Sequence, residues 1–94
     1  MCRKEMVLDR EDLLKVLRNL EVVVVSLDRV GSYSSDLSKE TQNELLADFI
    51  DRWEVFDKLA ESRGILSEYF GRALGDDDMD ELERALQDVE YWNP

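Results

Sequence analysis

Apolar residues recur at alternating spacings of three and four along two long stretches, and this periodicity constrains the fold more than any other feature. The first series is Leu13, Val16, Leu20, Val23, Leu27 and Val30. The second series is Leu46, Phe49, Trp53, Phe56 and Ala60. Such spacing places side chains on one face of an α-helix. Proline, which interrupts helices, occurs only at Pro94. The chain is therefore predicted to be all-α.

The first helix is predicted over residues 9–30, with Asp9 as N-cap and Gly31 as its C-terminal stop. The β-branched run 22–25 could also form a strand, but the helical periodicity continues through it, which favours helix. Four consecutive valines cover more than one face of a helix. A single helical partner cannot cover Val22, Val24 and Val25 together, so we expect a second covering surface and a homodimer.

Three further helices are predicted over residues 38–63, 65–74 and 78–91. Candidate N-caps for the first of these are Ser35, Asp36 and Ser38. The last helix is expected to begin at Asp78, because Glu81 three residues later completes a capping-box pattern. The expected architecture is a small helical bundle. It is built on a long antiparallel helical hairpin with two shorter C-terminal helices.

The chain is expected to be a single acidic helical domain over residues 1–94, with a flexible N-terminus at residues 1–8. Its 94 residues are 44% hydrophobic, which is enough for a core without a metal or disulfide. Cys2 is the only cysteine, and the longest apolar run is four residues, against roughly 20 needed to span a bilayer. These features predict a cytoplasmic protein with no membrane contact.

Few residues in this sequence could support catalysis. The chain has no His, which removes most general-base designs and most transition-metal sites. The run 76–81 resembles the start of a calcium loop, but it lacks the required Gly and the final Glu. Residues 54–57 match Glu-x-x-Asp, one half of a motif of all-α nucleoside-triphosphate pyrophosphatases, and the other half is missing. We therefore expect no enzyme activity, metal or cofactor.

The formal net charge is −11, and residues 65–94 alone carry −7. Such a charge repels nucleic acid and anionic membranes and favours a basic protein partner. Two acidic faces are candidate partner-binding sites. They comprise Glu40, Glu44, Asp48, Asp51 and Glu54 in the second helix, and Asp76, Asp77, Asp78, Asp80, Glu81 and Glu83 near the last helix.

The aromatic residues divide into two groups. Phe49, Trp53 and Phe56 follow the helical periodicity and are predicted to lie in the core. Tyr33, Tyr91 and Trp92 fall outside it and are possible interface anchors, since Tyr and Trp are enriched at protein interfaces.

Two functions remain open on these grounds. The first is an acidic inhibitor or decoy of the nucleic-acid-mimic type, which occupies a basic surface of a nucleic-acid-binding protein. In charge, size and helix content the chain is similar to phage anti-restriction and anti-CRISPR proteins and to immunity proteins of nuclease toxins. The alternative is a self-associating helical adaptor, structural or regulatory protein whose acidic residues serve only solubility.

Overall fold

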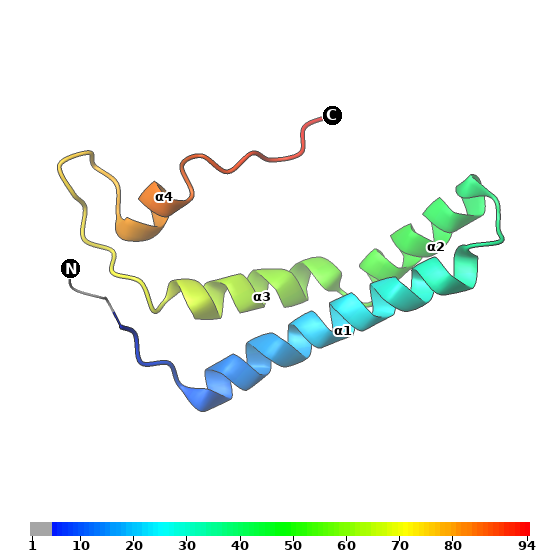
Figure 1. Ribbon diagram of the computed structural model, residues 1–94, viewed down its shortest axis with the longest axis horizontal. Helices are drawn as coiled ribbons and strands as arrows, with labels where there is room; N and C mark the ends of the chain where they lie inside the picture. The colour runs from blue at the N-terminus through cyan, green and yellow to red at the C-terminus, as the bar shows by residue number, and fades with distance from the viewer. Residues whose placement is uncertain (1–4) are drawn as a thin grey trace.

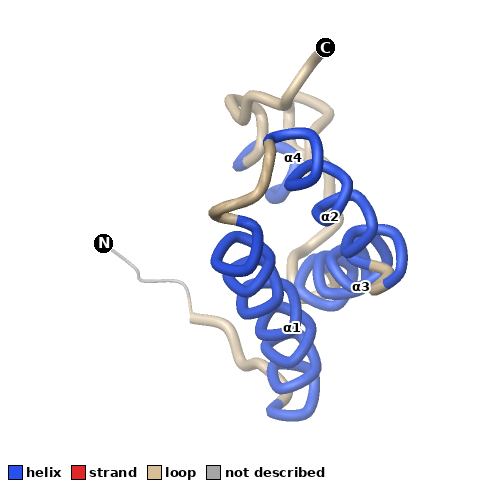
Figure 2. The backbone as a smooth tube through the Cα atoms, turned by 90° about the vertical axis from the view of Figure 1, so that its right-hand side faces the viewer, coloured by secondary structure: helices blue, strands red, loops and turns tan. Residues whose placement is uncertain are grey.

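A computed structural model describes residues 5–94, which form four helices and no strand. The helices are α1 (Arg10–Ser34), α2 (Lys39–Arg52), α3 (Val55–Ser67) and α4 (Glu81–Ala85). After α1 the chain reverses, and α2 and then α3 return along it, while α4 stands apart (Figure 1). Viewed along α1, the tube contains helices and loops only (Figure 2). The prediction of an all-helical protein is confirmed, and three main helices pack together. The predicted flexible segment 1–8 and Cys2 fall partly or wholly outside the described residues.

Helix α1 begins as predicted and ends later than predicted. The carboxylate of Asp9 accepts hydrogen bonds from the backbone N–H groups of Glu11 (2.7 Å) and Asp12 (3.2 Å), which caps the helix. The four valines are helical. Gly31 does not stop the helix, which continues to Ser34. The side-chain amide of Gln42 donates to the carbonyl of Ser34 (2.9 Å) at the end of the helix and to that of Leu37 (3.0 Å) in the loop that follows. The helix thus ends without a glycine cap, and the carbonyl of its last residue is bonded to a side chain of α2.

The predicted continuous helix 38–63 is wrong, because the chain breaks between α2 and α3. Of the three candidate caps, Ser38 is the N-cap, and it accepts from the Thr41 backbone N–H at 3.2 Å. Helix α2 ends at Arg52, and Glu54 has φ 51° and ψ 46°, in the left-handed region. A non-glycine residue there costs about 1–2 kcal/mol. The break redirects the chain so that α2 and α3 both pack against α1.

The predicted helix 65–74 does not form as a separate element, and the predicted helix 78–91 is much shorter than expected. Helix α3 runs through Gly64 and ends at Ser67, after which the chain leaves the helix. Helix α4 has five residues. So short a helix needs tertiary contacts to extend. Helix α4 approaches only the end of α3 and does not pack closely against the three main helices (Figure 1).

The core is small and lies where the three main helices meet. Val23, Phe49 and Val55 form its centre, and Val30 packs against it. Polar contacts extend the α1–α3 contact, since the Asn19 side-chain amide donates to Ser62 Oγ (3.1 Å) and the Lys58 carbonyl (3.3 Å). Phe49 is buried as predicted.

The predicted core positions of Trp53 and Phe56 are wrong, because their side chains are 55% and 75% exposed. Phe56 lies beyond the left-handed residue Glu54, in α3, so it no longer continues the helical face of Phe49. Trp53 is still bonded to Phe49 through the backbone at the end of α2, and its side chain lies at the edge of the packed region.

The chain is more open than a compact domain of its size. Its Cα radius of gyration is 17.8 Å, against about 12 Å expected for this length. Its accessible surface is 8381 Å², against roughly 5,600 Å² for a compact monomer of this mass. Among the helices of residues 5–94, none combines the length and apolarity needed to cross a membrane.

Candidate partner-binding surfaces

The acidic face of α2 consists of exposed carboxylates at helical spacing. Its members are Glu40, Glu44, Asp48 and Asp51, and Glu54 follows just after the helix. At 100° per residue the four helical members lie within about 80° of arc. Asp48 pairs with Arg52 at 3.3 Å. Within residues 5–94, no Lys or Arg forms an ion pair with the other members. Most of this acidic face is thus open to an external cation.

A groove of about 440 Å³ lies between α1 and α2 and borders the acidic face. We call it the aromatic groove, and its lining is Ser26, Arg29, Val30, Tyr33, Leu45, Asp48, Phe49 and Trp53. Tyr33 is 77% exposed, as expected of an anchor. An exposed aromatic ring beside a carboxylate suits a Lys or Arg side chain, which gains both cation–π and ionic attraction.

Trp53 is the functional candidate that sequence reasoning missed. It is the C-cap of α2, and its carbonyl accepts a hydrogen bond from Lys58 Nζ. Neither glycine nor proline marks the break after it, so no local signal in the sequence separates this tryptophan from the buried Phe49. Its side chain is 55% exposed at the end of α2, where it lines the aromatic groove.

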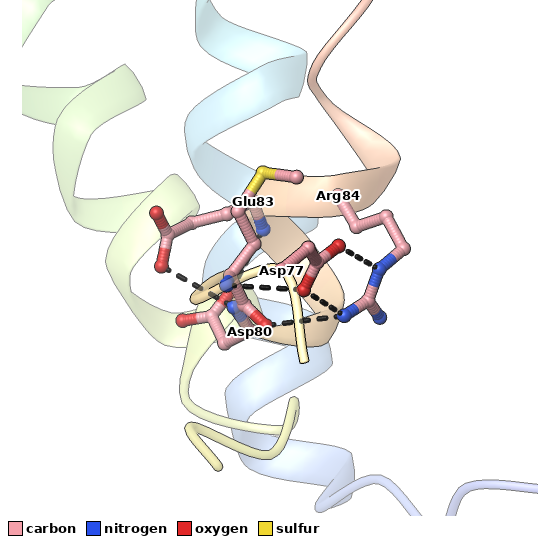
Figure 3. A network of polar contacts seen from close by, with 5 residues as sticks. Asp77, Asp80, Glu83 and Arg84 are labelled. Atoms are coloured by element: carbon pink, nitrogen blue, oxygen red, sulfur yellow. Dashed lines mark hydrogen bonds and ion pairs between the residues drawn. The ribbon is translucent and has the colours of Figure 1, made fainter. Parts of the chain in front are cut away.

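Half of the second acidic face forms hydrogen bonds within its own segment (Figure 3). Arg84 donates to Asp77 through two nitrogens, Nε to Oδ2 at 2.9 Å and Nη2 to Oδ1 at 2.8 Å. It also donates to the Met79 carbonyl at 3.1 Å. These bonds from Arg84 hold the pKa of the Asp77 carboxyl far below its usual range, and they raise the pKa of Arg84.

The capping box lies two residues later than predicted. Asp80, not Asp78, is the N-cap of α4, and it accepts from the Glu83 backbone N–H at 2.7 Å. Glu83 Oε1 in turn accepts from the Asp80 N–H at 3.4 Å. Asp78 has φ 59°, whereas an N-cap needs extended backbone. Three of the predicted site residues, Asp77, Asp80 and Glu83, therefore serve local folding. The other three, Asp76, Asp78 and Glu81, are exposed and take no part in these bonds.

A separate apolar groove of about 660 Å³ joins α3 to the C-terminal segment. Its lining is Arg63, Leu66, Ser67, Phe70, Leu82, Leu86, Val89 and Tyr91. Tyr91 lies at this groove and is 76% exposed, while Trp92 is 88% exposed. The structure thus places the three predicted anchors at two different sites, with Tyr33 on α1 and the other two at the C-terminal end.

Across residues 5–94, the acidic side chains nowhere gather in a group of three or more that could hold a metal ion. Comparison with known proteins gives no relative, because no family model, curated protein or solved structure matches the chain. The functional argument therefore rests on the surfaces themselves.

Proposed function

We propose that this protein is a non-enzymatic cytoplasmic inhibitor or decoy that occupies a basic surface of a nucleic-acid-handling protein. The observation that carries the proposal is the aromatic groove beside the acidic face of α2. Carboxylates at helical spacing imitate a row of phosphates, and Tyr33 and Trp53 offer rings on which cationic side chains can stack. Aromatic anchors surrounded by charge are typical of the residues that dominate binding energy at protein interfaces.

The face of α2 is the stronger candidate of the two acidic faces. Glu40, Glu44 and Asp51 are exposed and take part in no ion pair within the described chain. Like charges at this spacing repel each other by a few tenths of a kcal/mol per pair. A basic partner would relieve that repulsion and release counterions, so binding should weaken as salt rises.

The test is a charge-reversal pair after affinity capture of a partner from the native host. Glu40→Lys with Glu44→Lys should slow association with the captured protein while helicity is retained. A matched control, Glu5→Lys with Asp88→Lys, makes the same change in net charge at exposed positions outside the helices. The parent should also compete with DNA or RNA for the captured protein. If both double variants and the parent bind the captured protein equally well at low salt, the acidic face takes no part in binding.

The second candidate function is a self-associating helical adaptor. It is favoured by the apolar surface that a single chain leaves exposed, including Leu17, Val24 and Leu27 on α1. A decoy can also be a dimer, so this candidate is separated from the first by the competition experiment.

A further inference from the structure

Helix α1 carries a second apolar stripe beside the one it buries. We call it the open stripe, and its residues are Leu13, Leu17, Leu20, Val24 and Leu27, at spacings of 4, 3, 4 and 3. Leu17 is 58% and Val24 is 62% exposed, and Leu20 and Leu27 are also exposed. Side chains of this type lose favourable free energy when they face water.

The open stripe is uncovered because α2 and α3 pack on a neighbouring arc of α1. The buried residues Val16 and Val23, together with Val30, are centred roughly 80° away from the open stripe at 100° per residue. Helix α4 and the C-terminal tail lie beyond α3, away from α1 (Figure 1). Within residues 5–94, the part of this face around Leu17 and Val24 is therefore uncovered, and α2 approaches the face only at its C-terminal end, near Leu27 and Gly31.

The open stripe has the composition of a helix–helix seam. Every α1 residue in its arc is apolar or, at Gly31, glycine, and the charged residues of α1 lie on other arcs. In heptad terms Leu13, Leu20 and Leu27 occupy one apolar position, and Leu17 and Val24 occupy the other. The three leucines are thus at d, and the a positions hold Leu17 and the β-branched Val24. Leucine at d with a β-branched residue at a favours two-stranded pairing, and this stripe matches that pattern at Val24. The seam spans about 21 Å of helix.

The excess surface of the chain has the size that a dimer would bury. The accessible area of 8381 Å² exceeds the compact-monomer value by roughly 2,800 Å². Obligate homodimers bury about 2,000–5,000 Å² in total, or about 1,000–2,500 Å² per copy. The excess belongs to the whole chain, including the extended segments on either side of α4, and one side of such an interface needs only part of it.

Charge does not oppose this pairing. Leu27 and Gly31 line a groove of about 250 Å³ together with Leu46 of α2, so the apolar face continues onto the second helix. On α2, Leu46 and Ile50 lie roughly 80° of arc or more from the nearest residue of the acidic face, Glu40. The cation at this groove is Lys39. Two copies can thus meet without bringing their acidic faces together.

We propose that the open stripe is the docking surface for a second copy of this chain, which forms a homodimer through α1. The inference does not depend on the acidic face or on any basic partner. In the dimer the acidic face and aromatic groove of each copy stay outside, so the assembly presents two copies of each.

Sedimentation equilibrium of the full chain at micromolar concentration tests the proposal. The parent should have twice the 11.0 kDa chain mass. The double variant Leu17→Glu with Val24→Glu should be monomeric, because it places four carboxylates in the seam of each dimer. A matched control, Val7→Glu with Phe56→Glu, adds the same charge at apolar residues that are more than 70% exposed and lie off the stripe. This control should remain dimeric.

A milder variant guards against loss of folding in the charged double. Leu17→Ala with Val24→Ala keeps or raises helix propensity, and circular dichroism should show unchanged helicity. Its dimer dissociation constant should rise by at least about tenfold, since large apolar contacts are removed from the seam. A monomeric parent would overturn the proposal. So would a parent dimer that both stripe doubles leave intact, which would move the interface to another surface.

Discussion

The hydroxyl of Tyr69 donates a 2.6 Å hydrogen bond to Asp12 Oδ2, which joins the end of the α3 segment to the start of α1. The hydroxyl oxygen of Tyr69 in turn accepts a hydrogen bond from the backbone N–H of Asp9 at 3.0 Å. Tyr69 is 57 positions after Asp12 and 60 positions after Asp9 in the chain. The contact fixes the direction of the chain after α3.

Tyr69→Phe should lower the thermal unfolding midpoint, because it removes both bonds and leaves the ring in place. Circular dichroism melting checks this. Tyr91→Phe is the control, since Tyr91 is 76% exposed and its hydroxyl has no hydrogen-bond partner within the described residues. Equal melting of the two variants would show that the Tyr69 contact adds nothing to stability.

The same contact predicts a pH dependence at the alkaline end. The hydrogen bond to Asp12 raises the pKa of Tyr69 above its ordinary value of 10.0. The folded chain therefore holds this proton more tightly than the unfolded chain. The resulting stability is fully present below pH 10 and is lost as pH rises through the raised pKa. Ultraviolet titration of tyrosinate should show one late-titrating tyrosine that is absent from Tyr69→Phe.

A second pH dependence concerns Asp77 and lies at the acid end. Since Arg84 lowers the pKa of Asp77 below its ordinary value of 3.8, the stabilising ion pair is present above that value and is lost as pH falls further. Carboxyl chemical shifts measured by NMR should show Asp77 titrating last. In Arg84→Met the pKa of Asp77 should return toward its ordinary value of 3.8. An unchanged Asp77 titration in that variant would contradict the assignment.

Phe49 and Trp53 should differ sharply when truncated. Phe49 is 6% exposed, so Phe49→Ala should cost on the order of 3–5 kcal/mol in unfolding free energy. Trp53 is 55% exposed, and Trp53→Ala should cost about 1 kcal/mol or less. Denaturant unfolding measures both values. Comparable losses would place Trp53 back in the core and remove it from the aromatic groove.

Glu54→Gly should stabilise the chain by up to about 1 kcal/mol. Its φ of 51° is strained for glutamate and open to glycine, although glycine adds entropy to the unfolded state. Ala47→Gly, in the exposed middle of α2, is the control and should destabilise by about 1 kcal/mol. If both changes destabilise equally, residue 54 does not adopt the left-handed conformation in solution.

Several elements followed from local sequence alone. Asp9 and Ser38 cap their helices because a short polar side chain can reach the free N–H groups one turn ahead. The valine run 22–25 is helical because the apolar spacing of three and four continues through it. Tyr33 is exposed as expected, since it lies outside that spacing.

The tertiary structure alone decided where the second helix breaks and which apolar residues reach the core. Nothing near Glu54 signals a break, because the strain of its left-handed backbone is offset only when Phe49 and Val55 are buried against Val23. The apolar periodicity likewise identified one apolar face on α1, but this face contains both the buried stripe of Val16, Val23 and Val30 and part of the open stripe. The sequence determined that α1 is an apolar-faced helix. Only the packing of α2 and α3 decided which stripe they cover and which is left open, because burial depends on partners distant in the chain.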